Sequence, residues 1–332
     1  MKRISIGLSL LLLFGLMAGC HNEKPTAQTP KNAEEGKKVK IAGIGFQDDQ
    51  FFRLVEMGMK SQSEKSGVDF SPNSSMGAID KEASLIDALI SKHVNAICVA
   101  PVSQTASINA LKRAHDSGIP IITFDSVINA DFPVSSIRSD QKALGRPTGE
   151  IALRYIKEKL GGKAKIAILS YMSLAPEPAS QRSGGFEEAL KSLPGVQVVA
   201  RQDAWLAPQA VTVVESILTA HPDLDMIWAA NEGGTVGAVN AIKNAGKSGK
   251  IVVFGTDVSE QIAGFLLSKD NILQAVTGQK PLDIGTMAVE TALKVLQKKP
   301  VEKRVALPGV TYSRDKPDEV NKYLEYIRGV AK

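Results

Sequence analysis

Short apolar runs alternate with longer amphipathic segments along most of this 332-residue chain, and this alternation limits its possible folds. The runs are rich in β-branched residues and lack strict polar–apolar alternation, as strands buried on both faces of a sheet do. The segments between them carry apolar residues at helical spacing, and several end at glycine or proline. The apolar runs begin near residues 39, 96, 119, 164, 226, 251 and 272. The pattern predicts an α/β fold in which parallel sheets are covered by helices.

The number of strand–helix cycles indicates more than one sheet. At least seven cycles are present, which is too many for one small domain, so we expect two doubly wound parallel-sheet lobes. Candidate crossing points between the lobes lie at residues 135–141, 277–281 and 307–313. Three crossings would make both lobes discontinuous, and the pattern alone leaves that topology open.

The N-terminal residues have the organisation of an export signal. Lys2 and Arg3 are followed by an apolar run at 4–17 and by the small residues Ala18 and Gly19. The run is shorter than the roughly 20 residues that a membrane-spanning helix needs, and no later stretch approaches that length. We therefore expect export, with one N-terminal attachment as the only membrane element.

The residues around Cys20 indicate how the chain is attached. Residues 16–20, LMAGC, resemble the bacterial lipobox, in which the cysteine is lipidated and becomes the new N-terminus. This predicts a signal peptide at 1–19, a lipid on Cys20 and a flexible polar tether at 20–38. Ordinary secretion with cleavage at a small residue is the alternative. The mature chain is expected on the extracytoplasmic side of the membrane, anchored only by its lipid.

Charge and cysteine content argue against some classes of protein. The formal net charge of +5 at pH 7 falls by two with the signal peptide, and so mild an excess does not indicate nucleic-acid binding. Cys98 is the only cysteine besides Cys20 and lies in an apolar run. We expect no disulfide, and a buried, inert thiol at Cys98.

Motifs for nucleotide binding and catalysis are absent or incomplete. Residues 246–248, GKS, end like a phosphate-binding loop, but Ala241 occupies the place of its first glycine. The glycine pair at 43 and 45 is followed by Asp48, whose carboxylate would repel a pyrophosphate. No nucleophile motif or metal-ligand cluster is found, so we expect no enzyme, no cofactor and no metal. The scattered histidines, expected in the tether or at helix ends, are His21, His93, His115 and His221.

Polar side chains occur where the predicted strands end. The residues that directly follow these runs include Asp125, Asn231 and Asp257, with Ser170 and Tyr171 ending another. The first run leads into Gln47, Asp48, Asp49, Phe51 and Phe52. In an open parallel sheet the ligand crevice lies outside the carboxyl ends of the strands. Planar carboxylate and amide groups with aromatic rings beside them suit a small polar ligand such as a sugar.

Each of these residues also has a structural alternative. An Asp or Asn after a strand often caps the next helix, and for a single position this explanation is about as good as ligand binding. We expect at least one of Phe51 and Phe52 in the core. Trp205 lies in a polar loop, where burial is less obvious, whereas Trp228 lies inside an apolar run and should be structural.

From Val39 to about Ser313 the chain resembles the ribose-type periplasmic sugar-binding proteins of ABC importers, which have the type I periplasmic binding fold. The resemblance depends on segments in the family's order: FQDDQFFRLVEMGMK with its aromatic pair, AICVAPVSQTASINALKRAHDSGIPIITFDS, QRSGGFEEAL and IVVFGTD. It implies two lobes joined by a three-strand hinge. The N-terminal lobe would comprise residues 39–138 and 280–309, and the C-terminal lobe residues 139–279 and 310–332.

The resemblance also implies ligand-binding roles for residues at matched positions. These are Asp49, Phe51, Phe52, Asp125, Trp205, Asn231, Asp257 and Gln279. Ser126 and Ser180 replace two arginines of the ribose binders, and Arg182 resembles an arginine at the start of a helix; all three are candidate site residues. Because serine cannot replace the five donors of arginine, ribose is not predicted.

The aspartates among these residues, together with Asp48, would make a cleft rich in hydrogen-bond acceptors. Such a cleft suits a neutral polyol, another sugar or a ligand that carries an amine, and the sequence does not choose among them. An anionic ligand is disfavoured unless Arg138 or Arg182 reaches the site.

The sequence therefore predicts a monomeric, non-enzymatic binding protein that closes on a sugar or polyol and presents the closed form to an ABC transporter permease. A ligand sensor that docks on a chemoreceptor or histidine kinase shares the fold and is the alternative. Sugar-responsive regulators share the core but carry an N-terminal helix-turn-helix, which this chain lacks. A glycosidase would need a tuned acid and base, for which no motif is present.

Overall fold

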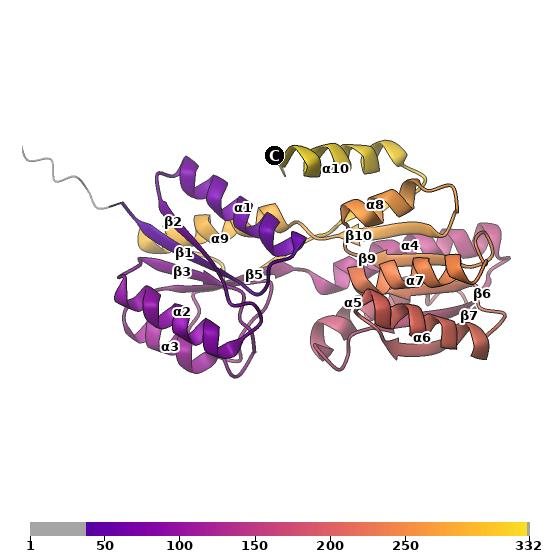
Figure 1. Cartoon of the computed structure of the whole chain (residues 1–332), viewed down its shortest axis with the longest axis horizontal. Helices are drawn as coiled ribbons and strands as arrows, with labels where there is room; N and C mark the ends of the chain where they lie inside the picture. The colour runs from indigo at the N-terminus through magenta and orange to yellow at the C-terminus, as the bar shows by residue number, and fades with distance from the viewer. Residues whose placement is uncertain (1–37, 331–332) are drawn as a thin grey trace, which may run out of the picture. The chain divides into compact units, whose positions relative to one another are not determined.

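The computed structural model describes residues 38–330, which belong to one compact unit (Figure 1). The predicted signal peptide at 1–19, the predicted lipid on Cys20 and the predicted tether up to residue 37 lie outside the described residues. Among the residues that the structure describes, no helix is long and apolar enough to cross a bilayer.

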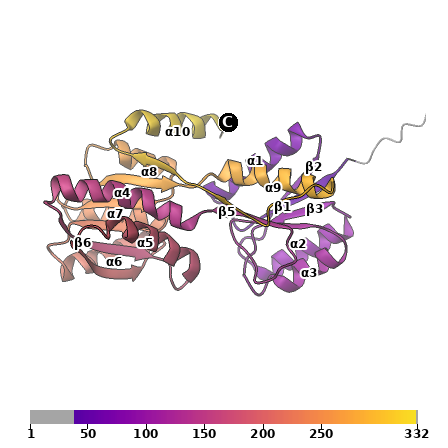
Figure 2. The same ribbon diagram turned by 180° about the vertical axis from the view of Figure 1, so that it is seen from behind.

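One sheet has six parallel strands in the order β11-β5-β4-β3-β1-β2. In chain order these strands are β1 (Lys40–Gly45), β2 (Asp69–Ser74), β3 (Ala96–Val99), β4 (Ile121–Phe124), β5 (Ser135–Ser139) and β11 (Arg304–Leu307). Helices α1 (Gln50–Lys65) and α9 (Pro281–Leu296) pack on one face, and α2 (Ile79–Ser91) and α3 (Ile108–Asp116) cover the other (Figure 2). The inner strands are buried on both faces, which explains their unbroken apolar runs.

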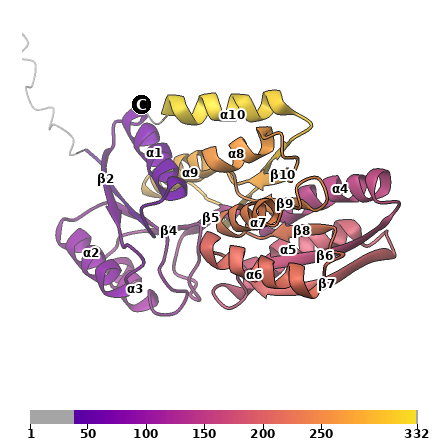
Figure 3. The ribbon, with the colours of Figure 1, turned by 45° about the vertical axis from the view of Figure 1, so that its right-hand side comes forward.

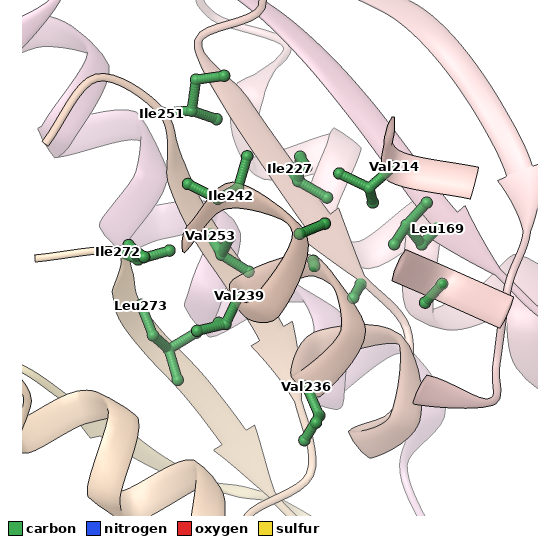
Figure 4. Packing of buried hydrophobic residues seen from close by; sticks show 14 of the residues in the cluster. Leu169, Val214, Ile227, Val236, Val239, Ile242, Ile251, Val253, Ile272 and Leu273 are labelled. Atoms are coloured by element: carbon green, nitrogen blue, oxygen red, sulfur yellow. The ribbon is translucent and has the colours of Figure 1, made fainter. Parts of the chain in front are cut away.

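A second sheet has the order β12-β10-β9-β8-β6-β7. Its strands are β6 (Lys163–Ser170), β7 (Gly195–Asp203), β8 (Met226–Ala229), β9 (Val252–Thr256), β10 (Leu273–Gly278) and β12 (Val310–Ser313), the last antiparallel to β10. Helices α4 (Gln141–Lys159) and α5 (Pro176–Leu190) cover one face, and α6 (Ala207–Ala220), α7 (Glu232–Asn244), α8 (Glu260–Leu267) and α10 (Pro317–Val330) cover the other. Figure 4 shows the core under α7, where Ile227 and Val253 of the sheet meet Val239 and Ile242.

The two sheets share one strand order, so β4 of the first corresponds to β9 of the second. The chain passes between the sheets three times, from β5 to β6, from β10 to β11 and from β11 to β12 (Figure 3). This confirms the predicted fold class of two doubly wound sheets joined by three crossing segments. The predicted lobe boundaries, after residues 138, 279 and 309, lie close to the ends of β5, β10 and β11.

All seven predicted strands are present, but the apolar pattern misses five others: β2, β5, β7, β11 and β12. β2 is an edge strand paired with β1, and its sequence DFSPNS contains Pro72. An edge strand tolerates proline and needs no continuous apolar run. Helix α4 begins at Gln141, where Asp140 caps it by accepting from the Ala143 N–H at 3.0 Å.

Two core predictions are confirmed. The Cys98 thiol is fully buried, donates to the Ala288 carbonyl at 3.6 Å, and has its pKa raised by burial to about 12. Trp228 is fully buried, stacks on Phe186 with ring centroids 5.0 Å apart, and donates its indole N–H to Thr148 Oγ1 at 3.1 Å. Neither group is available for chemistry at the surface.

Candidate functional site

A cavity of about 920 Å³ lies at the carboxyl ends of strands from both sheets. Seven of the predicted site residues line it: Asp49, Phe51, Asp125, Trp205, Asn231, Asp257 and Gln279. All seven side chains are partly accessible, neither locked in the interior nor fully exposed. The topology brings them together because parallel strands end at one edge of each sheet.

Two aspartates occupy corresponding positions in the two sheets. Asp125 follows β4 and Asp257 follows β9, and their backbone N–H groups donate to Ile137 at 3.0 Å and Thr277 at 2.9 Å on the neighbouring strands. Both have a left-handed backbone, with φ of 58° and 68°. This conformation is uncommon for residues other than glycine and is often retained at functional sites.

Asp257 is held by a hydrogen-bond chain that reaches the first sheet. Its Oδ2 accepts from the Glu232 N–H at 3.1 Å, and its Oδ1 accepts from Gln279 Nε2 at 2.9 Å. The other end of the Gln279 amide accepts from Ser139 Oγ, at the end of β5, at 2.8 Å. This series of hydrogen bonds therefore links Asp257 of the second sheet to the crossing segments that follow β5 and β10.

Arg182 lies behind Asp257 and is not one of the residues that line the cavity. Its guanidinium is buried 3.6 Å from Asp257 Oδ2, and its Nε donates to Gln141 Oε1 at 2.7 Å. Its Nη1 donates to the Ala230 carbonyl at 2.9 Å, and the group stands 5.6 Å from the centre of the Tyr171 ring. In this arrangement Arg182 compensates the charge of Asp257.

Asp49 and Asn231 both cap helices, as the structural alternative predicts. Asp49 Oδ1 accepts from the Phe52 N–H at 2.9 Å, and Asn231 Oδ1 accepts from the Gly234 N–H at 3.1 Å. Asn231 also donates to the Trp205 carbonyl at 2.8 Å. That carbonyl would lie 2.1 Å from a Cβ at position 233, so glycine there allows the Trp205 loop to approach. Capping thus positions these residues at the cavity.

Both rings of the aromatic pair are half-buried against the core of the first sheet, but they differ in their contact with the cavity. Phe51 lines the cavity, whereas Phe52 lies within an aromatic cluster, with ring centroids 5.1 Å from Phe51, 6.0 Å from Phe46 and 6.5 Å from Phe124. Phe52 therefore supports Phe51 from behind.

Ser126 and Ser180 are also absent from the cavity wall. Ser180 is exposed on α5 and lines a separate hollow with Met172 and Arg201. Residues two positions apart on a helix face nearly opposite sides. Because Arg182 points inward from α5, Ser180 points away from the site. Asp48, which the sequence places in the acidic cleft, does not line the cavity. It is exposed and pairs with Arg53 at 3.1 Å.

The structure adds residues that sequence reasoning missed, including Glu232, Lys280 and Tyr323. Glu232 stands directly after Asn231, and its position after a strand is the one sequence feature that points to it. Tyr323 belongs to α10, beyond the segment that resembles the sugar-binding family, and its hydroxyl donates to the Val258 carbonyl at 3.0 Å.

The environment of the cavity raises the pKa of two of its carboxyl groups. Burial raises the pKa of Asp125 to about 6, with smaller contributions from Asp257 and Asp49, although the Arg182 cation opposes them. Burial also raises the pKa of Glu232, again reinforced by Asp257 and Asp49 and opposed by a hydrogen bond from Ser259. The carboxylates at this site are therefore shielded from water, and in their ionised forms they repel one another.

Residues 44–300 match the family model described as periplasmic binding protein domain. The chain belongs to this family. The periplasmic-binding protein YphF of an Escherichia coli ABC transporter is 32% identical over 286 residues, covering 84% of this chain and 86% of YphF. The ribose import binding protein RbsB of Bacillus subtilis is 29% identical over 309 residues, covering 92% of this chain and 97% of RbsB.

Solved structures of the family agree with the fold of this binding protein. A solute-binding protein from Actinobacillus succinogenes, solved with bound D-allose, has 27% identity and a TM-score of 0.76 and covers 85% of this chain and all of its own. These relatives are named as binding proteins of transporters, and none of the three is named as an enzyme.

Proposed function

We propose that this protein is an extracytoplasmic solute-binding lipoprotein that captures a sugar or polyol and delivers it to an ABC importer. The observation that carries the proposal is the single cavity into which the two sheets together bring Asp125, Trp205, Asn231 and Asp257. The relatives named for ribose import and the family member with bound D-allose support it.

The proposed binding chemistry follows from the residues on the cavity wall. Asp125, Asp257 and Gln279 offer acceptors and one amide donor to the ligand hydroxyls, while Phe51 and Trp205 offer apolar faces to its C–H groups. Asp49 and Asn231 each retain hydrogen-bonding capacity beyond their capping bonds. Arg182 acts behind Asp257, and Ser126, Ser180 and Phe52 lie outside the wall.

Ligand binding is proposed to close a hinge between the lobes 39–138 with 280–309 and 139–279 with 310–332. A ligand that contacts both sheets binds the closed form more tightly and so shifts the population towards it. The permease would then recognise the closed monomer. Cleavage after residue 19 and lipidation of Cys20 would keep the protein beside that permease on the extracytoplasmic side.

Native mass spectrometry of the purified protein, followed by a thermal-shift panel of pentoses, hexoses and polyols, tests ligand capture. We expect a co-purified or added sugar or polyol to raise the melting temperature, by an amount that grows with its excess over Kd. A panel without any stabilising member, and a spectrum without a bound small molecule, would contradict the proposal.

Delivery to an importer is tested separately in cells. Deletion of the gene should abolish uptake of the identified ligand, and replacement of Cys20 by alanine should release the protein from the membrane fraction. Intact uptake with loss of a response to the ligand would favour a sensor that docks on a chemoreceptor or histidine kinase.

A further inference from the structure

The cavity wall is acidic although the chain is basic overall. The formal net charge of the whole chain is +5. The cationic side chains on the wall are Lys280 and Lys322, and the anionic ones are Asp49, Asp125, Glu232, Asp257, Asp283 and Glu319. Because the wall carries more acidic than basic side chains, it attracts cationic ligands and repels anionic ones.

Four of these carboxylates are half-buried, and within the described residues three of the four form no ion pair. Asp257 is paired with the buried Arg182. Within residues 38–330, Asp49, Asp125 and Glu232 form no ion pair, and Asp49 and Asp125 come from the first sheet whereas Glu232 comes from the second. The pKa shifts of Asp125 and Glu232 both include repulsion by Asp49 and Asp257, so this repulsion acts across the cavity. Ionised carboxylates contributed by the two sheets thus repel one another across the cavity.

We propose that the ligand carries a cationic amine in addition to hydroxyl groups, as an amino sugar or an aminopolyol does. The inference rests on the proposed function, because it concerns the same cavity. The positive charge of such a ligand, lying between the sheets, replaces the mutual repulsion of Asp49, Asp125 and Glu232 with attraction to a common cation. The ligand hydroxyls pair with Asp257 and Gln279.

An organic cation suits this site better than a metal ion. Across the described part of the chain, no three His, Cys, Asp or Glu side chains are grouped closely enough to hold a metal. A carboxylate set that is spread over the cavity wall matches a ligand whose charge and hydroxyls are also spread. Phe51 and Trp205 contribute apolar faces, and an aromatic face also attracts an ammonium group.

A charge series on fixed scaffolds tests the inference with the full mature chain. The compounds are glucose, glucosamine and glucuronate; galactose, galactosamine and galacturonate; and glucitol, its 1-amino-1-deoxy derivative and gluconate. On every scaffold that binds, calorimetry should give a Kd at least about tenfold lower for the amine than for the neutral form, with the acid weakest. Added salt should weaken the amine more than the neutral form.

The pH dependence has a definite sign. Ionised Asp125 and Glu232 attract the amine, so its affinity should be highest above the Asp125 pKa of about 6 and fall as the pH drops below it. The alkylamine of the glucitol derivative stays protonated over this range. Tyr171, whose pKa burial raises to about 12, stays neutral, and Arg182, whose pKa is raised by the neighbouring acidic groups, stays charged.

Isosteric variants separate the charge from the shape of the site. Glu232→Gln should reduce the ratio of amine to neutral affinity about fivefold or more. Asp87→Asn removes a carboxylate on α2 that pairs with Arg113 at 2.9 Å and is not part of the cavity wall, so it should leave the ratio unchanged.

The outcomes distinguish this inference from the function on which it rests. Equal or tighter binding of the neutral form on every scaffold that binds overturns the cationic ligand and leaves sugar or polyol capture intact. Failure of all the compounds, together with a native mass spectrum free of any co-purified sugar or polyol, contradicts the proposed function itself.

Discussion

At the scale of single residues, Asp257 joins several parts of the site. It accepts hydrogen bonds from Glu232 on α7 and from Gln279 after β10, and it neutralises the buried Arg182. Its left-handed backbone directs the chain away from β9, and asparagine tolerates that conformation better than alanine does. Asparagine at this position therefore removes the charge with the least change in backbone.

Asp257→Asn should weaken ligand binding by about 2–3 kcal/mol, or roughly 30- to 150-fold in Kd, because ligand hydroxyls lose a charged acceptor. The fold should survive, since the amide oxygen still accepts from the Glu232 N–H. Calorimetry with the identified ligand measures the loss, and Asp48→Asn, at an exposed residue outside the cavity wall, is the control. Unchanged affinity of Asp257→Asn would remove this residue from the site.

At the scale of elements, close helix packing holds the residues behind the site. Helices α4 and α5 approach each other through glycines, and a Cβ at Gly145 would lie 1.8 Å from the Arg182 carbonyl. A Cβ at Gly185 would similarly lie 2.3 Å from the Lys142 carbonyl. Because Arg182 belongs to α5, this contact sets how far its guanidinium reaches towards Asp257.

Gly145→Ala should lower the free energy of unfolding by about 1–3 kcal/mol, because the helices must separate to admit the methyl group. Gly184→Ala, on α5 where an added methyl group would meet no atom within 4 Å, should instead be neutral or stabilise by up to about 1 kcal/mol. Urea unfolding of both variants provides the measurement. Equal effects of the two substitutions would show that the close approach does not control stability.

Helix α10 is an element outside the matched family segment 44–300 that nevertheless reaches the site. It packs beside α8, where Arg328 pairs with Glu260 at 2.7 Å (Figures 1 and 3). Its Tyr323 hydroxyl holds the carbonyl of Val258, the residue directly after Asp257. The C-terminal helix thus supports the loop that carries a proposed ligand contact.

At the scale of the whole molecule, the proposed hinge closure would move the two sheets as bodies about the three crossing segments. The hydrogen bonds between Ser139, Gln279 and Asp257 join the ends of β5, β10 and β9. A ligand that competes for Gln279 and Asp257 therefore acts where the crossing segments meet the site. In the proposed mechanism, this arrangement would couple ligand contacts to the angle between the sheets.

Small-angle scattering should show a smaller radius of gyration when a saturating ligand is added, because the closed form is the one that contacts ligand from both sides. Asp257→Asn should reach the same compact state, but only at higher ligand concentration. Saturation by thermal shift without any compaction would contradict hinge closure.

Local sequence patterns predict a large part of this protein. Apolar runs with β-branched residues mark strands that are buried on both faces, and they locate seven strands of the sheets. The residue after such a run falls at the carboxyl edge of the sheet, so Asp125 and Asp257 can be assigned to the cavity before any coordinates are known. These features depend only on near neighbours in the chain.

Tertiary packing decides the rest, because it joins groups whose spacing carries no local signature. The inward turn of Arg182 and the outward turn of Ser180 depend on how α5 packs on α4. The rings around the aromatic pair decide that Phe51 lines the cavity and Phe52 does not. The raised pKa of Asp125 arises from burial and from charges contributed by both sheets, and no stretch of sequence contains that environment.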